Sequence, residues 1–246
     1  MKRTVTVIVL GVVAFAAMVL ARLPASWVLA AAGSGFSCVS IEGSVWNGYC
    51  GGLRVRGAAL GDLTWQVRPV RLLVGKLAAH VDLEQPPRLA VQGDVEIGLG
   101  GAFLARNLTA SLPLDPKVLP GLPPTLTGTL RLDLALARVT RNGVVRSLRG
   151  RIEARDLVDS SGYVTPLGNF AVTFPGGTAA TTGRLRDLGG PLAVQGKLVL
   201  TPQPGYDLSG YVTPRASAVP ALVNAIEFLG SPDAQGRREF ALSGTY

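Results

Sequence analysis

Few residues in this sequence are arranged in a pattern that is typical of a catalytic site. Its one histidine, His80, lies in the strand-like segment LAAHVDLE, where an imidazole is more often structural than a general base. Asp94 and Glu96 share one side of an alternating segment, so we expect both carboxylates to be solvated. Gly98 and Gly100 lack the third glycine of a dinucleotide loop, and no nucleophile elbow, Walker loop or HExxH motif occurs. The sequence therefore predicts a protein that is not an enzyme, with no catalytic residue and no cofactor.

The two cysteines, Cys38 and Cys50, could form a disulfide if the chain reaches an oxidising compartment. The loop that they would close is short, and its closure would stabilise the fold by about 3 kcal/mol in the chain-entropy model. Two free buried thiols are the alternative. Two cysteines and one histidine do not favour a soft-metal site, so no metal is expected.

Arginine dominates the charge of the chain, whose formal net charge is +8. The densest group lies within residues 131–155, where Asp133 and Glu153 are the only acidic residues. For an exported protein, acidic protein surfaces or anionic lipid headgroups are more plausible partners than nucleic acid. The alternative is a strand face that contacts only solvent. The arginines expected to contact a partner are Arg138, Arg141, Arg146, Arg149, Arg151 and Arg155.

The N-terminal segment predicts export. Residues 1–3 carry Lys2 and Arg3, and the 18 residues from 4 to 21 contain no charge. A helix of that length crosses roughly 30 Å of hydrocarbon, and the positive-inside rule leaves residues 1–3 in the cytosol. We therefore expect a signal anchor at residues 4–21, with the bulk of the chain beyond the membrane. Cleavage after Ala21 is the alternative.

Beyond a linker at residues 22–35, the hydropathy pattern has a period of two residues. In LTGTLRLDLAL, residues 126–136, the leucines lie on one face and polar side chains on the other. Such alternation is typical of half-exposed antiparallel strands. We expect one mainly β domain at residues 36–246, with a proline-rich connection at residues 113–124 that cannot be a central strand.

Glycine recurs within these strands in a fixed position. LAVQG occurs at residues 89–93 and again at 192–196, and similar segments place a glycine on the apolar face. A missing side chain there lets a sheet curl tightly or lets another backbone approach. The pattern predicts a strongly curved antiparallel sheet resembling a half-barrel, although chance repetition in a glycine-rich chain is the alternative. The glycines concerned are Gly93, Gly128, Gly150, Gly196, Gly210 and Gly244.

Helix is scarce in the sequence. The best candidate is VPALVNAIEFLG, with Pro220 in its first turn and Gly230 as its stop. Its apolar residues Leu222, Ile226 and Leu229 are spaced to cover one end of the sheet.

Five segments together resemble one protein family. They are LPASWVL, GSVWNG at residues 43–48, LGDLTWQVRP at 60–69, LPPTLTGTLRLDL at 122–134 and FLGSPDAQGRREFALSGTY from Phe228. In this order they are similar to the type II secretion system protein N family. The resemblance implies a bacterial inner-membrane protein with a single span and a periplasmic β domain. Its role would be that of a non-enzymatic accessory subunit, with other envelope components of the system as partners.

The strand-and-glycine pattern is also similar to that of AsmA-like periplasmic proteins, whose curved sheets are associated with lipid handling. This resemblance implies an alternative function, in which the concave face is an open groove that binds lipid. Packed core is the other interpretation of the same face. The leucines expected on it are Leu126, Leu130, Leu132, Leu198 and Leu200.

Overall fold

The structure is a computed structural model of the chain. It describes residues 18–28, 35–86, 89–116, 123–162, 164–177 and 181–245, together with residues 10, 11, 15 and 33. Most of the predicted membrane segment, residues 4–21, therefore lies outside the described residues. Within the described part of the chain, no helix is both long enough and apolar enough to span a membrane.

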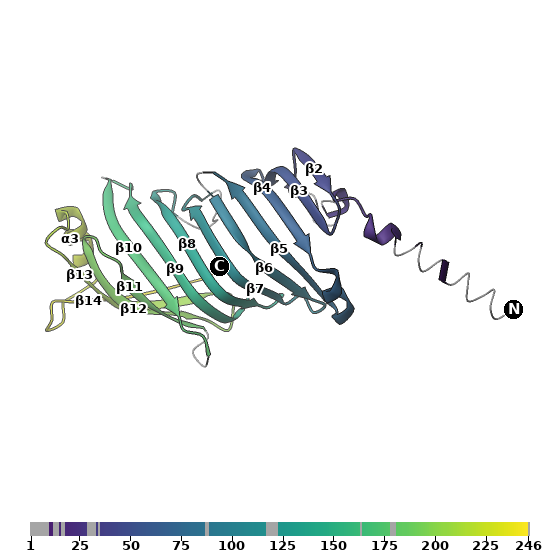
Figure 1. Cartoon of the computed structure of the whole chain (residues 1–246). Coiled ribbons are helices and arrows are strands. Elements are labelled where there is room, and N and C mark those ends of the chain that lie inside the picture. Colours follow the sequence, from purple (N-terminus) through teal and green to yellow (C-terminus); the bar gives the residue numbers. More distant parts are fainter. Residues whose placement is uncertain are drawn as a thin grey trace.

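The described strands form one antiparallel sheet of 14 strands (Figure 1). From β3 to β14, each strand pairs with the next strand along the chain, while β1 and β2 both pair with β3. The sheet is not closed on itself, and β14 forms one of its edges. The strands are β1 (Phe36–Ser37), β2 (Ser40–Gly43), β3 (Asn47–Val55), β4 (Ala58–Val67), β5 (Lys76–Gln85), β6 (Leu89–Gly98), β7 (Phe103–Pro113), β8 (Leu126–Val139), β9 (Val145–Asp159), β10 (Thr165–Phe174), β11 (Thr182–Asp187), β12 (Leu192–Leu200), β13 (Tyr206–Pro214) and β14 (Arg238–Gly244).

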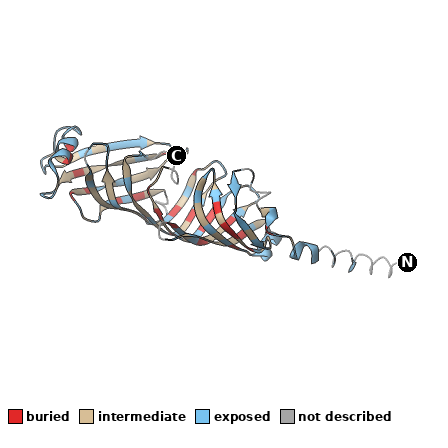
Figure 2. Cartoon of the chain, turned by 90° about the horizontal axis from the view of Figure 1, so that it is seen from above, coloured by how far each residue is buried: buried red, intermediate tan, exposed pale blue. Residues whose placement is uncertain are grey.

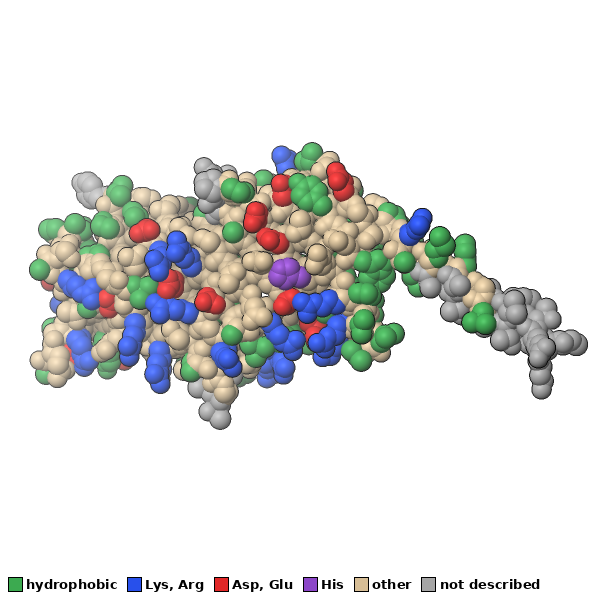
Figure 3. Space-filling view, in the orientation of Figure 1, with side chains coloured by type: hydrophobic (Ala, Val, Ile, Leu, Met, Phe, Trp, Pro, Cys, Tyr) green, Lys and Arg blue, Asp and Glu red, His purple; other side chains and the backbone are tan. Residues whose placement is uncertain are grey.

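The predicted alternation becomes two faces of different chemistry. Leu132 on β8 lies between Ala110 on β7 and Ile152 on β9, and Ile152 lies opposite Val172 on β10. These side chains continue one apolar face across the sheet, while the intervening charged residues gather on the other face (Figure 3). The sheet curves strongly, so that its C-terminal strands bend away from the polar face (Figures 1 and 2). The prediction of a mainly β fold with one curved antiparallel sheet is confirmed, and the sheet is not closed.

Three clusters of buried residues lie along the apolar face. The first surrounds Trp65 and Cys50 near the N-terminal edge. The second surrounds Phe174, which is 1% exposed, in the middle of the sheet. The third surrounds Val194 and Val212 at the C-terminal strands. The core is therefore spread along a curved surface, which agrees with the scattered red segments in Figure 2.

The one helix expected beyond the N-terminal segment is present. Helix α3 (Pro220–Glu227) buries Leu222 and Ile226 against the third cluster. It ends three residues before Gly230, because the N–H of Leu229 and that of Gly230 each bond to a carbonyl only three residues earlier. The 3-10 helix η1 (Pro69–Val74) joins β4 to β5 and buries none of its residues.

The predicted position on the apolar face is confirmed for Gly150, Gly196 and Gly210. Gly150 lies opposite Leu134, and Gly210 lies between Gly196 and Phe240, all on the apolar face. A side chain there would collide with the neighbouring strand, because a Cβ on Gly150 would lie 2.7 Å from the Cα of Leu134. Pro113 ends β7 and Leu126 begins β8, so the proline-rich stretch connects two adjacent strands of the same sheet.

Candidate interaction surfaces

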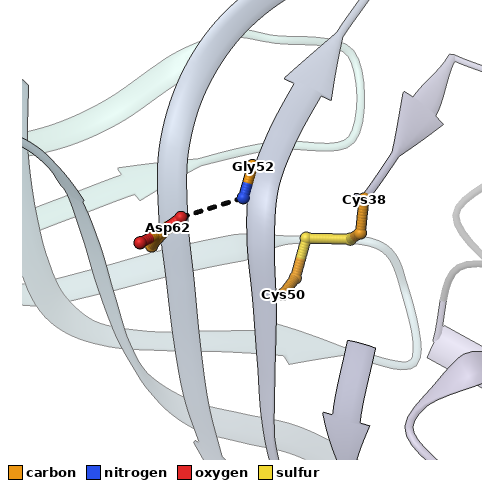
Figure 4. Close-up of a disulfide and its surroundings, with 4 residues drawn as sticks. All are labelled: Cys38, Cys50, Gly52 and Asp62. Carbon is orange, nitrogen blue, oxygen red and sulfur yellow. Dashed lines mark hydrogen bonds between the residues drawn. A yellow bond between two sulfur atoms is a disulfide. The ribbon is translucent and has the colours of Figure 1, made fainter. Parts of the chain in front are cut away.

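A disulfide holds the N-terminal edge of the sheet. Cys38 lies between β1 and β2 and pairs with Cys50 on β3, with a Cα–Cα distance of 5.6 Å (Figure 4). Immediately after Cys50, the register of β3 against β4 is irregular. There the N–H of Gly52 donates a hydrogen bond to Oδ1 of Asp62 at 2.8 Å. The predicted disulfide is confirmed, and it places a covalent link where two short strands would otherwise be held by few ladder bonds.

His80 lies in a row of interacting polar side chains on the polar face of the sheet. It lies directly opposite Asp94, with 3.2 Å between Nδ1 and Oδ1, and Arg68 contacts the same oxygen at 3.0 Å. The amide of Gln92 lies 3.5 Å from the other ring nitrogen. Within the described residues, no group of three or more His, Cys, Asp or Glu side chains is placed to hold a metal. This arrangement joins β5 to β6 through the contacts of the imidazole with Asp94 and Gln92.

Glu153 forms ion pairs with two of the arginines that the sequence singled out, which leaves one net positive charge among the three side chains. Its carboxylate contacts Arg151 at 2.6 Å and Arg155 at 2.7 Å. The hydrogen bond from Arg155, together with the charge of Arg151, holds the pKa of Glu153 below its usual value, although burial acts in the opposite direction. This end of β9 is therefore less basic than its sequence implies.

The other four arginines of this group are exposed to solvent. Arg138 and Arg149 project from β8 and β9 and have no ion-pair partner among the described side chains. Arg146 lies where the register shifts between Arg138 and Val139. Arg141 lies in the turn between the two strands and packs beside Gly101 of the neighbouring turn. The six arginines thus share one hairpin, and Arg149, Arg151 and Arg155 lie on its polar face because they alternate along β9 with apolar residues such as Leu148 and Ile152.

The sequence analysis missed three cations that extend this basic surface. Arg184 and Arg186 on β11 are exposed, as is Lys197 on β12, which lies directly opposite Arg184. Thr173 connects them to the arginines, because it lies opposite both Arg151 and Arg184. The alternating segment GRLRD at residues 183–187 was the available signal, but only the strand order places it beside β9 and β10.

The polar face is hollowed between β5 and β9. A cavity of about 490 Å³ lies there, with acidic side chains from β5 on one side and arginines interspersed with Asp133 and Glu153 on the other. Asp82 and Glu84 come from β5, whereas Arg131 and Arg151 come from β8 and β9. A ligand here would meet both signs of charge, which suits a protein surface better than a small anion.

A second hollow lies on the apolar face and has a different lining. It has a volume of about 490 Å³ and runs from β9 to β14 beneath α3. Leu242, which is 60% exposed, and Leu229 lie at its rim. The residues that line this apolar groove are Ile152, Ala154, Phe170, Val172, Leu185, Leu192, Val194, Leu208, Val212, Ile226, Leu229, Phe240, Ala241 and Leu242.

The five leucines expected in such a groove lie beside it instead. Leu132, Leu198 and Leu200 pack against the central cluster around Phe174, and Leu126 and Leu130 are not part of the lining. The groove is formed where β10 to β14 curve beneath α3, a feature that depends on long-range strand order. Individual strand patterns could not locate it.

Comparison with known proteins supplies the family. A family model described as type II secretion system (T2SS), protein N matches residues 34–241. The chain belongs to this family. It is 28% identical over 247 residues to the type II secretion system protein N of Aeromonas hydrophila, covering 96% of each chain. It is also 28% identical over 218 residues to that of Vibrio cholerae, covering 85% of each. No solved structure is significantly similar.

The family match extends over every strand from β1 to β13 and over α3. The basic surface of β8 to β12 and the lining of the apolar groove other than Leu242 therefore belong to the part of the chain that matches the protein N model. The resemblance inferred from the five sequence segments is confirmed. Membership of this family assigns the chain to type II secretion in an accessory role.

Proposed function

We propose that this protein is a non-enzymatic accessory subunit of the type II secretion system that supports the export of folded proteins from the periplasm across the outer membrane. The family match over residues 34–241 is the observation that carries the proposal. In this proposal residues 4–21 anchor the chain in the inner membrane, and the sheet lies in the periplasm. A disulfide between Cys38 and Cys50 is compatible with that oxidising compartment.

The subunit acts by binding other envelope components of the system through its polar face. Exposed cations on β8, β9, β11 and β12 provide a basic surface for an acidic partner. The hollow between Asp82 and Arg151 gives this face a shape that a protein surface could fill. The contact residues that the sequence singled out, Arg138, Arg141, Arg146, Arg149, Arg151 and Arg155, remain part of this proposal.

A secretion assay tests the role. The gene is deleted, and exoproteins are quantified in the medium and in the periplasm. Complementation uses the full chain and a variant in which a cleavable signal peptide replaces residues 4–21. We expect cargo to accumulate in the periplasm of the deletion strain and only the anchored form to restore export. Unchanged export in the deletion strain would refute the secretion role, and full rescue by the unanchored form would refute the anchor.

The apolar groove favours a second candidate function, the binding of lipid. Its lining consists entirely of apolar residues, and the strands β10 to β13 are each paired in the ladder on both sides. An acyl chain needs no hydrogen bonds and suits such a lining, whereas a peptide lying over these strands would leave its own backbone polar groups unpaired. The test is mass spectrometry of the full chain extracted from membranes in mild detergent. Absence of co-purified lipid, with the protein still folded, would remove this candidate.

A further inference from the structure

Two neighbouring turns at one end of the sheet expose large apolar side chains. Leu73 in η1 is 86% exposed, and Leu99 in the turn between β6 and β7 is 93% exposed. The turns touch each other, because a Cβ on Gly75 would lie 2.6 Å from Cδ1 of Leu99. We call this surface the apolar tip. It consists of Val70, Leu72, Leu73, Val74 and Leu99.

The composition of these turns is unusual for a surface exposed to water. Connections between strands are usually formed by Gly, Pro, Asn, Asp and Ser, yet η1 reads PVRLLV and buries none of its residues. Contiguous exposed apolar side chains mark a site of contact with a protein or a membrane. The apolar tip has no role in the core, since its members belong to none of the three buried clusters.

Basic side chains surround the apolar tip. Lys76 contacts Glu96 at 2.8 Å, and Arg106 lies 3.8 Å from the same carboxylate. Arg68 is paired with Asp94 at 3.0 Å, while Arg71 within η1 has no ion-pair partner among the described residues. These four cations and two carboxylates leave two positive charges next to the apolar side chains.

Further cations lie on the same end of the molecule. Arg141 packs beside Gly101, in the same turn as Leu99. Arg138 lies opposite Leu104, which in turn lies opposite Glu96. Figure 3 shows hydrophobic side chains gathered beside a group of Lys and Arg at the end of the sheet nearest the N-terminal segment. The residues around the apolar tip are therefore strongly basic.

We propose that the apolar tip inserts into the interface of a lipid bilayer that carries anionic headgroups, with Arg71 and Arg141 among the groups that contact those headgroups. Protruding apolar side chains flanked by cations match the two requirements of an interfacial membrane contact. A fluid bilayer accepts two convex turns, whereas a protein partner would need a pocket shaped to both. The N-terminal segment leaves the sheet at this end (Figure 1), so the predicted anchor would hold the apolar tip near a membrane surface.

The position of the apolar tip near a membrane rests in part on the anchor of the proposed function, so the test of the lipid contact must report on the apolar tip itself and not on secretion. The full chain is reconstituted into vesicles with an environment-sensitive fluorophore on a single added cysteine, since Cys38 and Cys50 are already paired. Leu99→Cys places the probe on the apolar tip. Phe228→Cys is the matched control, because Phe228 is 92% exposed and lies beyond α3 at the far end of the sheet.

In vesicles with anionic lipid, we expect the probe at position 99 to show blue-shifted emission and quenching by spin-labelled lipid. The probe at position 228 should show neither. Neutral vesicles, or the added pair Arg71→Gln and Arg141→Gln, should remove most of the quenching at position 99. Equal quenching at positions 99 and 228 would overturn the proposal. Equal quenching of position 99 in neutral and in anionic vesicles would overturn the contact with anionic headgroups. Protection of position 99 only in native membranes would assign the apolar tip to a protein partner and also overturn it.

Discussion

Gly196 on β12 lies directly opposite Gly210 on β13, and both face the apolar side of the sheet. A Cβ on Gly210 would lie 2.7 Å from the Cα of Gly196 and 3.0 Å from Cζ of Phe240. The missing side chains therefore let two backbones approach and let Phe240 pack across them. Gly196 ends the second copy of LAVQG, so the repeated segment serves the packing of the curved sheet.

Substitution of Gly210 by alanine should lower the stability of the protein. Overpacking of a well-filled site costs about 1–3 kcal/mol, and here a neighbouring backbone limits the relaxation. Chemical denaturation of the full chain in detergent measures the change. Asp207→Ala on the exposed face of the same strand is the control. Equal unfolding midpoints for the two variants would show that the close approach does not constrain the sheet.

Removal of the disulfide should destabilise the N-terminal edge. The cysteines are separated by 12 positions, and closure of a loop of this size is worth about 3 kcal/mol in the chain-entropy model. We expect the double variant Cys38→Ser and Cys50→Ser to unfold at lower denaturant concentration than the oxidised protein. Reductant should reproduce the loss in the native sequence and leave the double variant unchanged. A native protein insensitive to reductant would contradict this.

Asp187 links three segments near the apolar groove. Its carboxylate accepts hydrogen bonds from the N–H of Val194 at 3.0 Å and from Arg215 at 2.6 Å, and Arg215 also donates to the carbonyls of Gly190 and Leu192. Burial raises the pKa of Asp187, but the hydrogen bond from Arg215 and those from backbone N–H groups outweigh it, so its pKa lies below the usual value.

This lowered pKa predicts a defined pH dependence. The folded state binds the proton of Asp187 more weakly than the unfolded state, whose carboxyl titrates near pH 3.9, about the value of a free Asp. The stabilisation is present above that pH and is lost as the pH falls through the lower folded pKa. Asp187→Asn should cost about 2 kcal/mol at neutral pH, because it removes a charged partner of Arg215. Denaturation across the acid range should show this difference shrinking below about pH 4, and a constant difference would refute the assignment.

Local patterns could predict the strands, but not the surfaces they form. Period-two alternation predicted the strand β8, and the apolar spacing of residues 220–230 predicted α3. The alternation of β8 is broken, however, where its register against β9 shifts between Leu134 and Leu136, so that Ala137 packs with Leu134 in the central cluster. In β7, Ala105 and Leu108 pack in the same cluster although they are three residues apart. Asn107 has a φ of 49°, and at this point the register of β7 against β6 shifts, which restores the apolar residues to one face. Such register shifts and the strand order depend on the whole sheet, which is why the groove and the cations on β11 were missed.

Reversal of two exposed arginine charges should reduce secretion if the basic surface binds an acidic partner. Arg138→Glu with Arg149→Glu changes residues that have no ion-pair partner among the described side chains. A loss of about 1.4 kcal/mol in binding is a tenfold loss in affinity, so the complemented deletion strain should retain cargo in the periplasm. Arg54→Glu with Arg56→Glu changes the net charge equally at the N-terminal edge. Equal export by the two double variants would show that the surface of β8 and β9 has no specific role.

If lipid occupies the apolar groove, a charge introduced at the rim of the groove should reduce lipid binding. Leu242 on β14 lines the groove and is 60% exposed, so Leu242→Arg should leave the fold nearly as stable as before. A cation at this position would have to be desolvated for an acyl chain to enter, and burial of an unpaired charge is strongly unfavourable. We therefore expect less co-purified lipid per protein by mass spectrometry.

Val164→Arg is the matched control, because Val164 is 77% exposed and does not line the groove. Both variants add the same charge at an exposed apolar position, so a general effect of charge on lipid recovery would appear equally in both. A selective loss in Leu242→Arg places the lipid in the groove, since only that substitution changes its rim. Equal lipid content in the two variants and the native protein would place any bound lipid elsewhere on the chain and leave the groove to packing alone.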